Sequence, residues 1–213
     1  MQTVNRTVAP LVAALVLVLP LTATAAEEGA SDLIAQSMRE CLAGQDAGPR
    51  ETRKGHFERG EALATKAVAL DDASAAAHFA VVCNLGEMLR LDGEKITSVF
   101  GLHRLMSEVN RTLEIDPTHV NAMATKGNLL LRLPSMLGGD AKEGERLLRE
   151  VVRRDENAFT SRITLARTCE ARGDRDEAVE FASRALQIAT QQGRADKAAE
   201  AQSTLSELGA TKP

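Results

Sequence analysis

The chain has 213 residues, of which 44% are hydrophobic and 26% charged, and its formal net charge is −4 at pH 7. A mildly acidic chain with interspersed charges presents no basic surface for nucleic acid or anionic lipid. With no Trp, no Tyr and five Phe, it also lacks the aromatic platforms on which bases and sugars usually stack. Composition therefore argues against nucleic-acid-binding and sugar-binding proteins.

The first 26 residues have the pattern of a secretory signal peptide, with a weakly basic start, an apolar stretch and a small-residue end. The apolar stretch, residues 8–21, contains two prolines and is shorter than the roughly 20 residues that a membrane-spanning helix requires. We expect cleavage after Ala25 or Ala26; the alternative is an uncleaved anchor. Because no cysteine sits at the cleavage point, we predict a periplasmic or secreted protein without membrane insertion rather than a lipoprotein.

Residues 27–48 are predicted to contain the first helix of a helical hairpin. The stretch SDLIAQSMRECLAG is amphipathic, and Ser31 or Asp32 is expected to cap it. A QDAGP linker follows, and the second helix is expected over about residues 50–70.

Short residues recur at equal offsets in four segments of the chain. The sets are Gly60, Ala64, Ala67; Leu105, Val109, Thr112; Gly144, Leu148, Val151; and Ala178, Ala182, Ala185. Their first members lie 45, 39 and 34 residues apart, and the turn residues Asp71, Asp116 and Asp155 repeat the first two intervals. This self-similarity predicts an all-α, right-handed solenoid of about four helix-turn-helix hairpins, each burying its apolar face against the next.

The unequal intervals locate two insertions into a 34-residue period. One lies between residues 88 and 101, where a helical pattern with a single Asp-Gly break predicts lengthened helices. The other is LPSMLGG, residues 133–139, where Pro134 ends a helix and two glycines permit a tight reversal. Asp140 is expected to cap the helix that follows.

The array is predicted over residues 49–189, and its units are expected at approximately 31–72, 73–117, 118–156 and 157–190. Residues 191–208 are expected to form a C-terminal capping helix, because the end of a solenoid needs a polar outer face. The residues expected to cover the last hairpin are Ala195, Ala198, Gln202 and Leu205.

Over residues 55–189 the chain resembles the tetratricopeptide-repeat family. The matching positions are Leu165-Ala166, Gly173-Asp174, Ala178, Ala182, Ala185 and the Asp116-Pro117 turn. The resemblance implies that the first helices of successive hairpins line a concave groove, which receives an extended peptide or a helix of a partner protein.

A narrower resemblance links residues 133–157, LPSMLGGDAKEGERLLREVVRRDEN, to the periplasmic T components associated with tripartite ATP-independent transporters. It implies trimeric assembly around a central pore and docking to a solute-binding protein.

Three cysteines, Cys41, Cys83 and Cys169, leave at least one unpaired thiol or one intermolecular bridge in an oxidising compartment. We favour a Cys41–Cys83 disulfide, because both residues fall late in the first helices of successive hairpins, which lie side by side. The alternative is two independent small core residues. Cys169 replaces an apolar residue of its repeat and is expected to be a buried thiol.

The sequence contains no HExxH, CxxC or GxSxG motif and no phosphate-binding glycine loop, and its four histidines are scattered singly. A non-enzymatic protein without metal or cofactor is therefore predicted. Among the histidines, only His78 is expected to face the hollow of the array. Arg149 and Arg172 are expected on solvated helix surfaces.

Counting one helical face in register across the units gives the candidate groove residues. They are Phe79, Cys83 and Glu87, then Asn121, Asn128 and Arg132, then Ile163, Arg167 and Glu170. Asn128 and Arg132 lie one turn apart and could grip the backbone or a carboxylate of a bound peptide. The alternative is that they solvate an empty surface.

The leading functional hypothesis is a periplasmic or secreted scaffold that binds an unidentified protein or peptide in the groove. The alternative, from a different class, is a transporter accessory of the T-component kind. It would self-associate through the lengthened second hairpin and the LPSMLGG loop and would dock a solute-binding protein.

Overall fold

The computed structural model describes residues 21–91, 93 and 99–209, and this part of the chain is helical throughout apart from its turns. The elements are α1 Leu21–Asp46, α2 Arg50–Leu70, α3 Ala75–Leu91, α4 Val99–Ile115, α5 Val120–Arg132, the 3-10 helix η2 Ser135–Leu137, α6 Ala141–Arg154, α7 Phe159–Arg172, α8 Arg175–Gln191 and α9 Ala195–Glu207.

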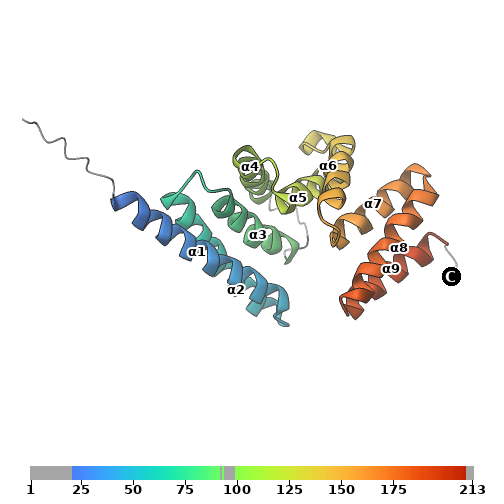
Figure 1. Ribbon diagram of the computed structural model, residues 1–213, viewed down its shortest axis with the longest axis horizontal. Coiled ribbons are helices and arrows are strands. Elements are labelled where there is room, and N and C mark those ends of the chain that lie inside the picture. The colour runs from blue at the N-terminus through green and yellow to red at the C-terminus, as the bar shows by residue number, and fades with distance from the viewer. Residues whose placement is uncertain (1–20, 92, 94–98, 210–213) are drawn as a thin grey trace, which may run out of the picture.

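Consecutive helices pack as hairpins, α1 with α2, α3 with α4, α5 with α6 and α7 with α8, and α9 covers α8 (Figure 1). The second helix of one hairpin also contacts the first helix of the next, so the hairpins form one elongated array. The predicted all-α array of helical hairpins with a C-terminal helix is confirmed. None of the described helices combines the length and the apolarity needed to cross a membrane.

The four sets of recurring short residues lie at the contacts between helices, and all twelve side chains or glycine positions are buried. The α5–α6 contact shows why short residues are needed there. A Cβ atom on Gly144 would lie 2.8 Å from the backbone oxygen of Gly127, and one on Gly127 would lie 2.7 Å from Leu148. Glycine at both positions therefore allows the two helices to approach closely.

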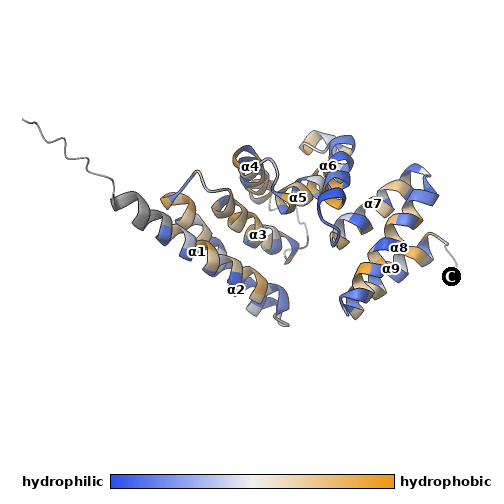
Figure 2. Cartoon of the chain, in the orientation of Figure 1, coloured by the Kyte–Doolittle hydropathy of each residue, from blue (hydrophilic) through white to orange (hydrophobic). Residues whose placement is uncertain are grey.

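The core is divided into small clusters between neighbouring helices instead of forming one central cluster. Met123, Leu147 and Val151 pack between α5 and α6, whereas Ala166, Cys169 and Ala178 pack between α7 and α8. Most helices in Figure 2 accordingly carry both hydrophobic and hydrophilic residues along their length. Such division is expected of an array in which each unit contacts only its neighbours.

The recurring aspartates build the same turn three times. The side-chain oxygens of Asp71, Asp116 and Asp155 each accept a hydrogen bond from the backbone N–H two residues later, at 3.0, 2.9 and 2.8 Å. This Asx turn satisfies a backbone donor where the chain leaves one helix and enters the next. The constant offset of these aspartates from Gly60, Leu105 and Gly144 in the sequence thus reflects one repeated local geometry.

The LPSMLGG segment has the predicted form of a loop between paired helices. Leu133 is extended, with φ −80° and ψ 140°, as its position before proline favours. Gly138 adopts φ 88°, and Asp140 caps α6 by accepting a hydrogen bond from the Glu143 N–H at 3.0 Å. Backbone hydrogen bonds from Gly139 to Pro134 and from Asp140 to Leu130 fix the reversal.

The structure differs from the sequence expectation at both ends of the array. Helix α1 does not begin at Ser31 or Asp32 but runs without a break from Leu21, since the alanine-rich residues before Ser31 continue the helix. At the other end, Ala195 and Gln202 of α9 are exposed, and the face that packs on α8 contains Ala198, Ala201, Thr204, Leu205 and Leu208.

Two expectations fall largely outside the described residues. Residues 1–20 of the predicted signal peptide lie outside the described residues. Residues 21–26 belong to α1. In the second unit, residue 92 and residues 94–98 are also outside the description. On either side of them, α3 and α4 have 17 residues each, longer than the 13 residues of α5 and the 14 of α6.

Candidate functional site

A cavity of about 820 Å³, here called the groove, opens between α3, α5 and the first turn of α7. Its volume is within the range of small-molecule and peptide sites. The apolar residues that line it include Phe79, Val82, Leu102, Leu105, Val120, Ala124, Leu129, Leu133, Leu137 and Phe159. The groove exists because α1 and α3 pack closely side by side, whereas α5 and α7 contact each other only slightly.

A polar stripe on α5 runs along the groove, formed by Asn121, Thr125 and Asn128. These residues occupy positions i, i+4 and i+7 and so share one face of the helix. The Asn128 amide donates to the Ala124 backbone oxygen at 2.8 Å and accepts from the Thr164 hydroxyl at 2.8 Å. An amide offers two donor hydrogens and two acceptor lone pairs, so Asn128 retains capacity for a ligand.

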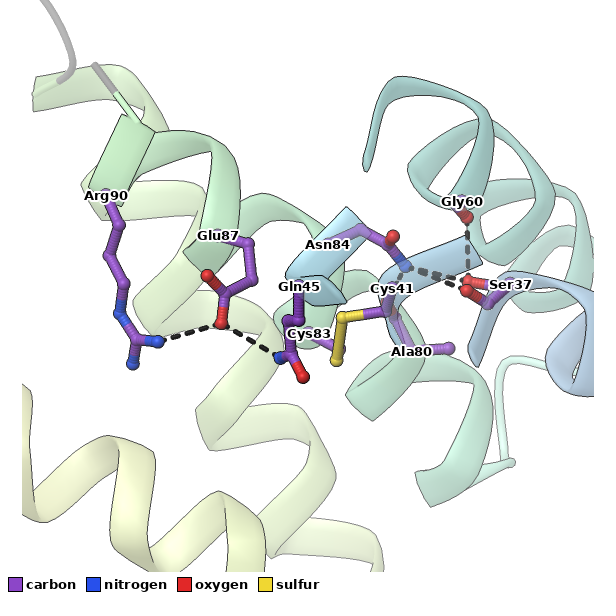
Figure 3. Close-up of a disulfide and its surroundings, with 9 residues drawn as sticks. All are labelled: Ser37, Cys41, Gln45, Gly60, Ala80, Cys83, Asn84, Glu87 and Arg90. Carbon is purple, nitrogen blue, oxygen red and sulfur yellow. Dashed lines mark hydrogen bonds and ion pairs between the residues drawn. A yellow bond between two sulfur atoms is a disulfide. The ribbon is translucent and has the colours of Figure 1, made fainter. Parts of the chain in front are cut away.

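Glu87 lies at the α1–α3 end of the groove and is only 8% exposed. Its Oε1 atom accepts hydrogen bonds from Gln45 of α1 at 3.0 Å and from Arg90 at 2.8 Å (Figure 3). This end of the groove therefore contains a nearly buried carboxylate that is held in position from two helices.

Two further contacts fasten α1 to α3 beside Glu87. A disulfide joins Cys41 to Cys83, with the two Cα atoms 6.3 Å apart, and it is the pairing favoured from the sequence. One turn earlier on α1, the Ser37 hydroxyl accepts a hydrogen bond from the Asn84 amide of α3 at 2.9 Å and donates one to the Gly60 backbone oxygen of α2 at 2.7 Å (Figure 3). The seam thus links three helices at successive turns of α1.

Comparison with solved structures places this geometry among known folds. MamA 41-end from Desulfovibrio magneticus RS-1 is 15% identical, covers 85% of this chain and 96% of its own, and gives a TM-score of 0.52. The MamA RS-1 ArsTM double mutant is 16% identical, and the match covers 85% of this chain and 95% of that one with a TM-score of 0.52. MamA AMB-1 is 14% identical, and the match covers 89% of this chain and 94% of that one with a TM-score of 0.50. The chain has a tetratricopeptide-repeat fold. No protein-family model and no curated sequence matches it significantly.

In this tetratricopeptide-repeat fold, six of the nine candidate groove residues line the groove. They are Phe79, Cys83, Glu87, Asn121, Asn128 and Arg132. Ile163 is instead 2% exposed and packs with Ala185 and Ala189 of α8. Arg167 and Glu170 are exposed but do not line the groove. These three residues therefore lie outside the groove, because α7 turns this face toward α8 and solvent and presents its first turn, including Thr160, to the groove.

Sequence reasoning missed the part of the groove formed outside the first helices. Gln45 comes from the end of α1, Leu102 from α4, and Leu133, Pro134 and Leu137 from the loop. Only the loop carried a signal, since hydrophobic residues in a connecting segment are unusual. Met136 beside it is 88% exposed and Leu137 is 50% exposed.

His78 does not face the groove, contrary to expectation. It is 4% exposed and lies between the α2–α3 turn and α4, where Nδ1 is 2.6 Å from Glu108 and Nε2 is 3.1 Å from the Asp72 backbone oxygen. With Arg111, these residues line a smaller hollow of about 390 Å³ on another surface. Both ring nitrogens have partners there, so His78 joins α4 to the preceding turn.

Arg149 and Arg172 take part in an ionic cluster instead of simply facing solvent. Arg149 contacts Glu145 at 2.8 Å, and Arg172 contacts the same carboxylate at 2.6 Å. Both arginines also contact Glu177, and the hydrogen bond from Arg149 holds the pKa of Glu177 down at about 2. The cluster connects α6, α7 and α8, so its role in the fold is to hold these helices together.

Cys169 is a buried thiol under this cluster, as expected. Its Sγ donates to Glu177 Oε2 at 3.2 Å. Burial and this hydrogen bond raise the pKa of the thiol to about 11, which disfavours the nucleophilic thiolate form. In the described part of the chain, no group of histidine, cysteine and carboxylate side chains is arranged to hold a metal ion.

Proposed function

We propose that the chain is a protein-interaction scaffold that binds an extended segment of a partner protein in the groove. One observation carries this proposal: the apolar residues that line the groove, here called the apolar floor, lie beside the polar stripe of Asn121, Thr125 and Asn128. Amide and hydroxyl groups can pair with the N–H and C=O groups of an extended backbone, while the apolar floor accepts every second side chain.

The composition of the groove favours binding over catalysis. The described residues that line it include no histidine and no free thiol. Glu87 already accepts two hydrogen bonds, and Asp155 accepts one from the Asn157 N–H. Among the described residues, neither carboxylate is hydrogen-bonded to the Thr125, Thr160 or Ser161 hydroxyl of the lining, so no nucleophile is paired there with a general base.

We further propose that the scaffold acts in the periplasm or outside the cell. The Cys41–Cys83 disulfide supports this location, because disulfides persist in oxidising compartments. The N-terminal apolar pattern supports it independently. Fractionation of cells, followed by mass measurement of the protein, tests the location; a cytosolic chain that retains residues 1–26 would contradict it.

Site-specific photo-crosslinking tests the binding surface. A photoreactive residue at Asn121, exposed on the polar stripe, is expected to capture a partner in intact cells. The same residue at Lys142, exposed on α6 away from the groove, is the control. Equal capture at both positions would contradict binding in the groove.

Replacing Asn128 and Arg132 together with alanine is expected to weaken capture from position 121 by roughly tenfold, because two polar contacts of the groove are removed. Circular dichroism must show an unchanged helix content, since Asn128 also contacts Thr164. Capture that is unaffected in a folded double variant would refute the assigned role of these two residues.

One observation favours the transporter accessory as a second candidate. Met136 and Leu137 are exposed hydrophobic side chains on a loop fixed by backbone hydrogen bonds, and such side chains favour self-association. Native mass spectrometry distinguishes the candidates. A stable trimer that dissociates on Met136→Ser substitution supports the accessory, whereas a monomer supports the scaffold.

A further inference from the structure

The carboxylate of Glu87 uses only one of its two oxygens within the chain. Oε1 accepts both hydrogen bonds, from Gln45 and from Arg90. In the described part of the chain Oε2 accepts none, and Figure 3 shows it outside both contacts. Although Glu87 as a residue is only 8% exposed, Oε2 is not one of the described side-chain atoms that are buried without a partner, so a donor can reach it from the groove. Because Glu87 lines the groove, a bound ligand can supply that donor.

We propose that this end of the groove binds a basic side chain, lysine or arginine, of the partner's extended segment. The inference rests on the proposed peptide-binding function and specifies what the groove recognises. The basic group would donate to Glu87 Oε2, and its aliphatic stem would lie along Cys83 and Phe79, which line the groove four and eight residues before Glu87 on α3.

Other carboxylates of this molecule show that a second cation fits beside the first. Glu145 and Glu177 each contact Arg149 and Arg172, and Glu150 contacts Arg153 and Arg154. A carboxylate between two cations is thus a common arrangement in this chain. Among the described residues, Glu87 contacts one cation, Arg90, and its second oxygen is available to another.

The arginines of the groove do not prevent this binding. Arg90 is compensated by Glu87 itself at 2.8 Å, and Arg194, at the α7 end of the groove, contacts Asp196 at 3.8 Å. Arg132 also has a partner. Position matters as well, because Glu87 is held by Gln45, and the Cys41–Cys83 disulfide fixes α1 and α3 one turn away. A fixed acceptor loses little entropy when a ligand binds.

Peptide selection tests the inference without knowledge of the natural partner. Phage-displayed random twelve-residue peptides are selected against the wild-type protein, Glu87→Gln and Glu180→Gln. The last variant removes an exposed carboxylate of α8 outside the groove. Lysine or arginine next to an apolar residue is expected to be enriched with the wild type and with Glu180→Gln, but not with Glu87→Gln.

Affinity measurements on one selected lysine peptide then give the size of the effect. Replacing that lysine with norleucine is expected to weaken binding to the wild type roughly tenfold or more, and binding to Glu87→Gln less than twofold. Arg90→Ala, which removes the competing cation from an exposed position, is expected to strengthen binding of the lysine peptide roughly threefold. Loss of folding cannot explain such a gain.

The outcomes separate this inference from the proposed function. One contrary result is that the selected peptides crosslink to position 121 without a preference for lysine or arginine, and another is that they bind Glu87→Gln as well as the wild type. Either result would overturn the inference and leave the peptide-binding function standing. Failure to select any peptide that crosslinks to position 121 would overturn the proposed function, and the inference with it.

Discussion

At the scale of single residues, the structure assigns ionic contacts to side chains whose sequence context suggested simple solvation. Arg149 lies between Glu145 and Glu177, and its guanidinium is also 5.5 Å from the centre of the Phe181 ring. Glu177 has a side chain that is 28% exposed, so these contacts are partly protected from solvent. We therefore expect this cluster, unlike isolated surface pairs, to contribute measurably to stability.

Glu177→Gln tests that contribution. The pKa of Glu177, about 2, is below its usual value of 4.5, so its stabilising effect is complete above about pH 4.5 and is lost as the pH falls toward 2. The variant is expected to be less stable than the wild type by about 1–3 kcal/mol at pH 7, with a smaller difference at pH 3. Urea unfolding at both pH values measures this, and Glu180→Gln should change stability little. An equal difference at both pH values would contradict the assignment.

The Cys169 thiol provides a second test at this scale. It is fully buried and its pKa is raised to about 11, so only about one thiol in a thousand is ionised at pH 8. The native protein is expected to react negligibly with a thiol reagent in minutes, and the denatured, unreduced protein to show one thiol per chain. Three thiols would show that Cys41 and Cys83 are not bonded.

At the scale of helices, the approach of α5 to α6 depends on glycine. Gly144→Ala would place a methyl group against the backbone of Gly127 and Leu131, and neither can move away without separating the helices. We expect a loss of about 1–3 kcal/mol in the free energy of unfolding.

Gly55→Ala in α2 is the matched control, because its Cβ would meet only the end of the Arg59 side chain, at 3.4 Å. Alanine has the higher helix propensity, so this variant should gain up to about 1 kcal/mol. Urea denaturation of both variants measures the changes. If both variants changed the free energy of unfolding in the same direction, helix propensity and not the close approach of α5 to α6 would control stability at these positions.

At the scale of the whole molecule, a covalent link joins the first two hairpins of the array. The Cys41–Cys83 disulfide connects residues 42 positions apart. Replacing both cysteines with serine is expected to lower the free energy of unfolding by about 2–4 kcal/mol. A reductant should destabilise the wild type by a similar amount and leave the double variant unchanged.

Hydrogen exchange should locate that loss. Units of a repeat array contact only their neighbours, so amides of α1 and α2 should exchange faster in the Cys41→Ser/Cys83→Ser variant, while those of α7 and α8 should not change. Uniformly faster exchange would show that the array unfolds as a single cooperative unit.

The helices, their turns and the order of the hairpins are set by local sequence. Spacing of the short residues predicted the helix contacts, Asp71, Asp116 and Asp155 predicted the turns, and Pro134 with Gly138 predicted the loop. Each of these features depends on residues within one or two helical turns, or on contacts between adjacent helices. Periodicity in a single sequence reports such contacts directly.

The groove was decided by tertiary structure. Register along the repeats predicted Glu87 and Asn128, which line the groove, but it assumed that every first helix presents the same face. Helix α7 does not, because packing of Ile163 against α8 and α9 fixes its rotation. Likewise, the meeting of Gln45 with Glu87 depends on how α1 crosses α3. Helix rotation and crossing follow from the summed packing of many side chains, and that sum appears only when the chain is folded.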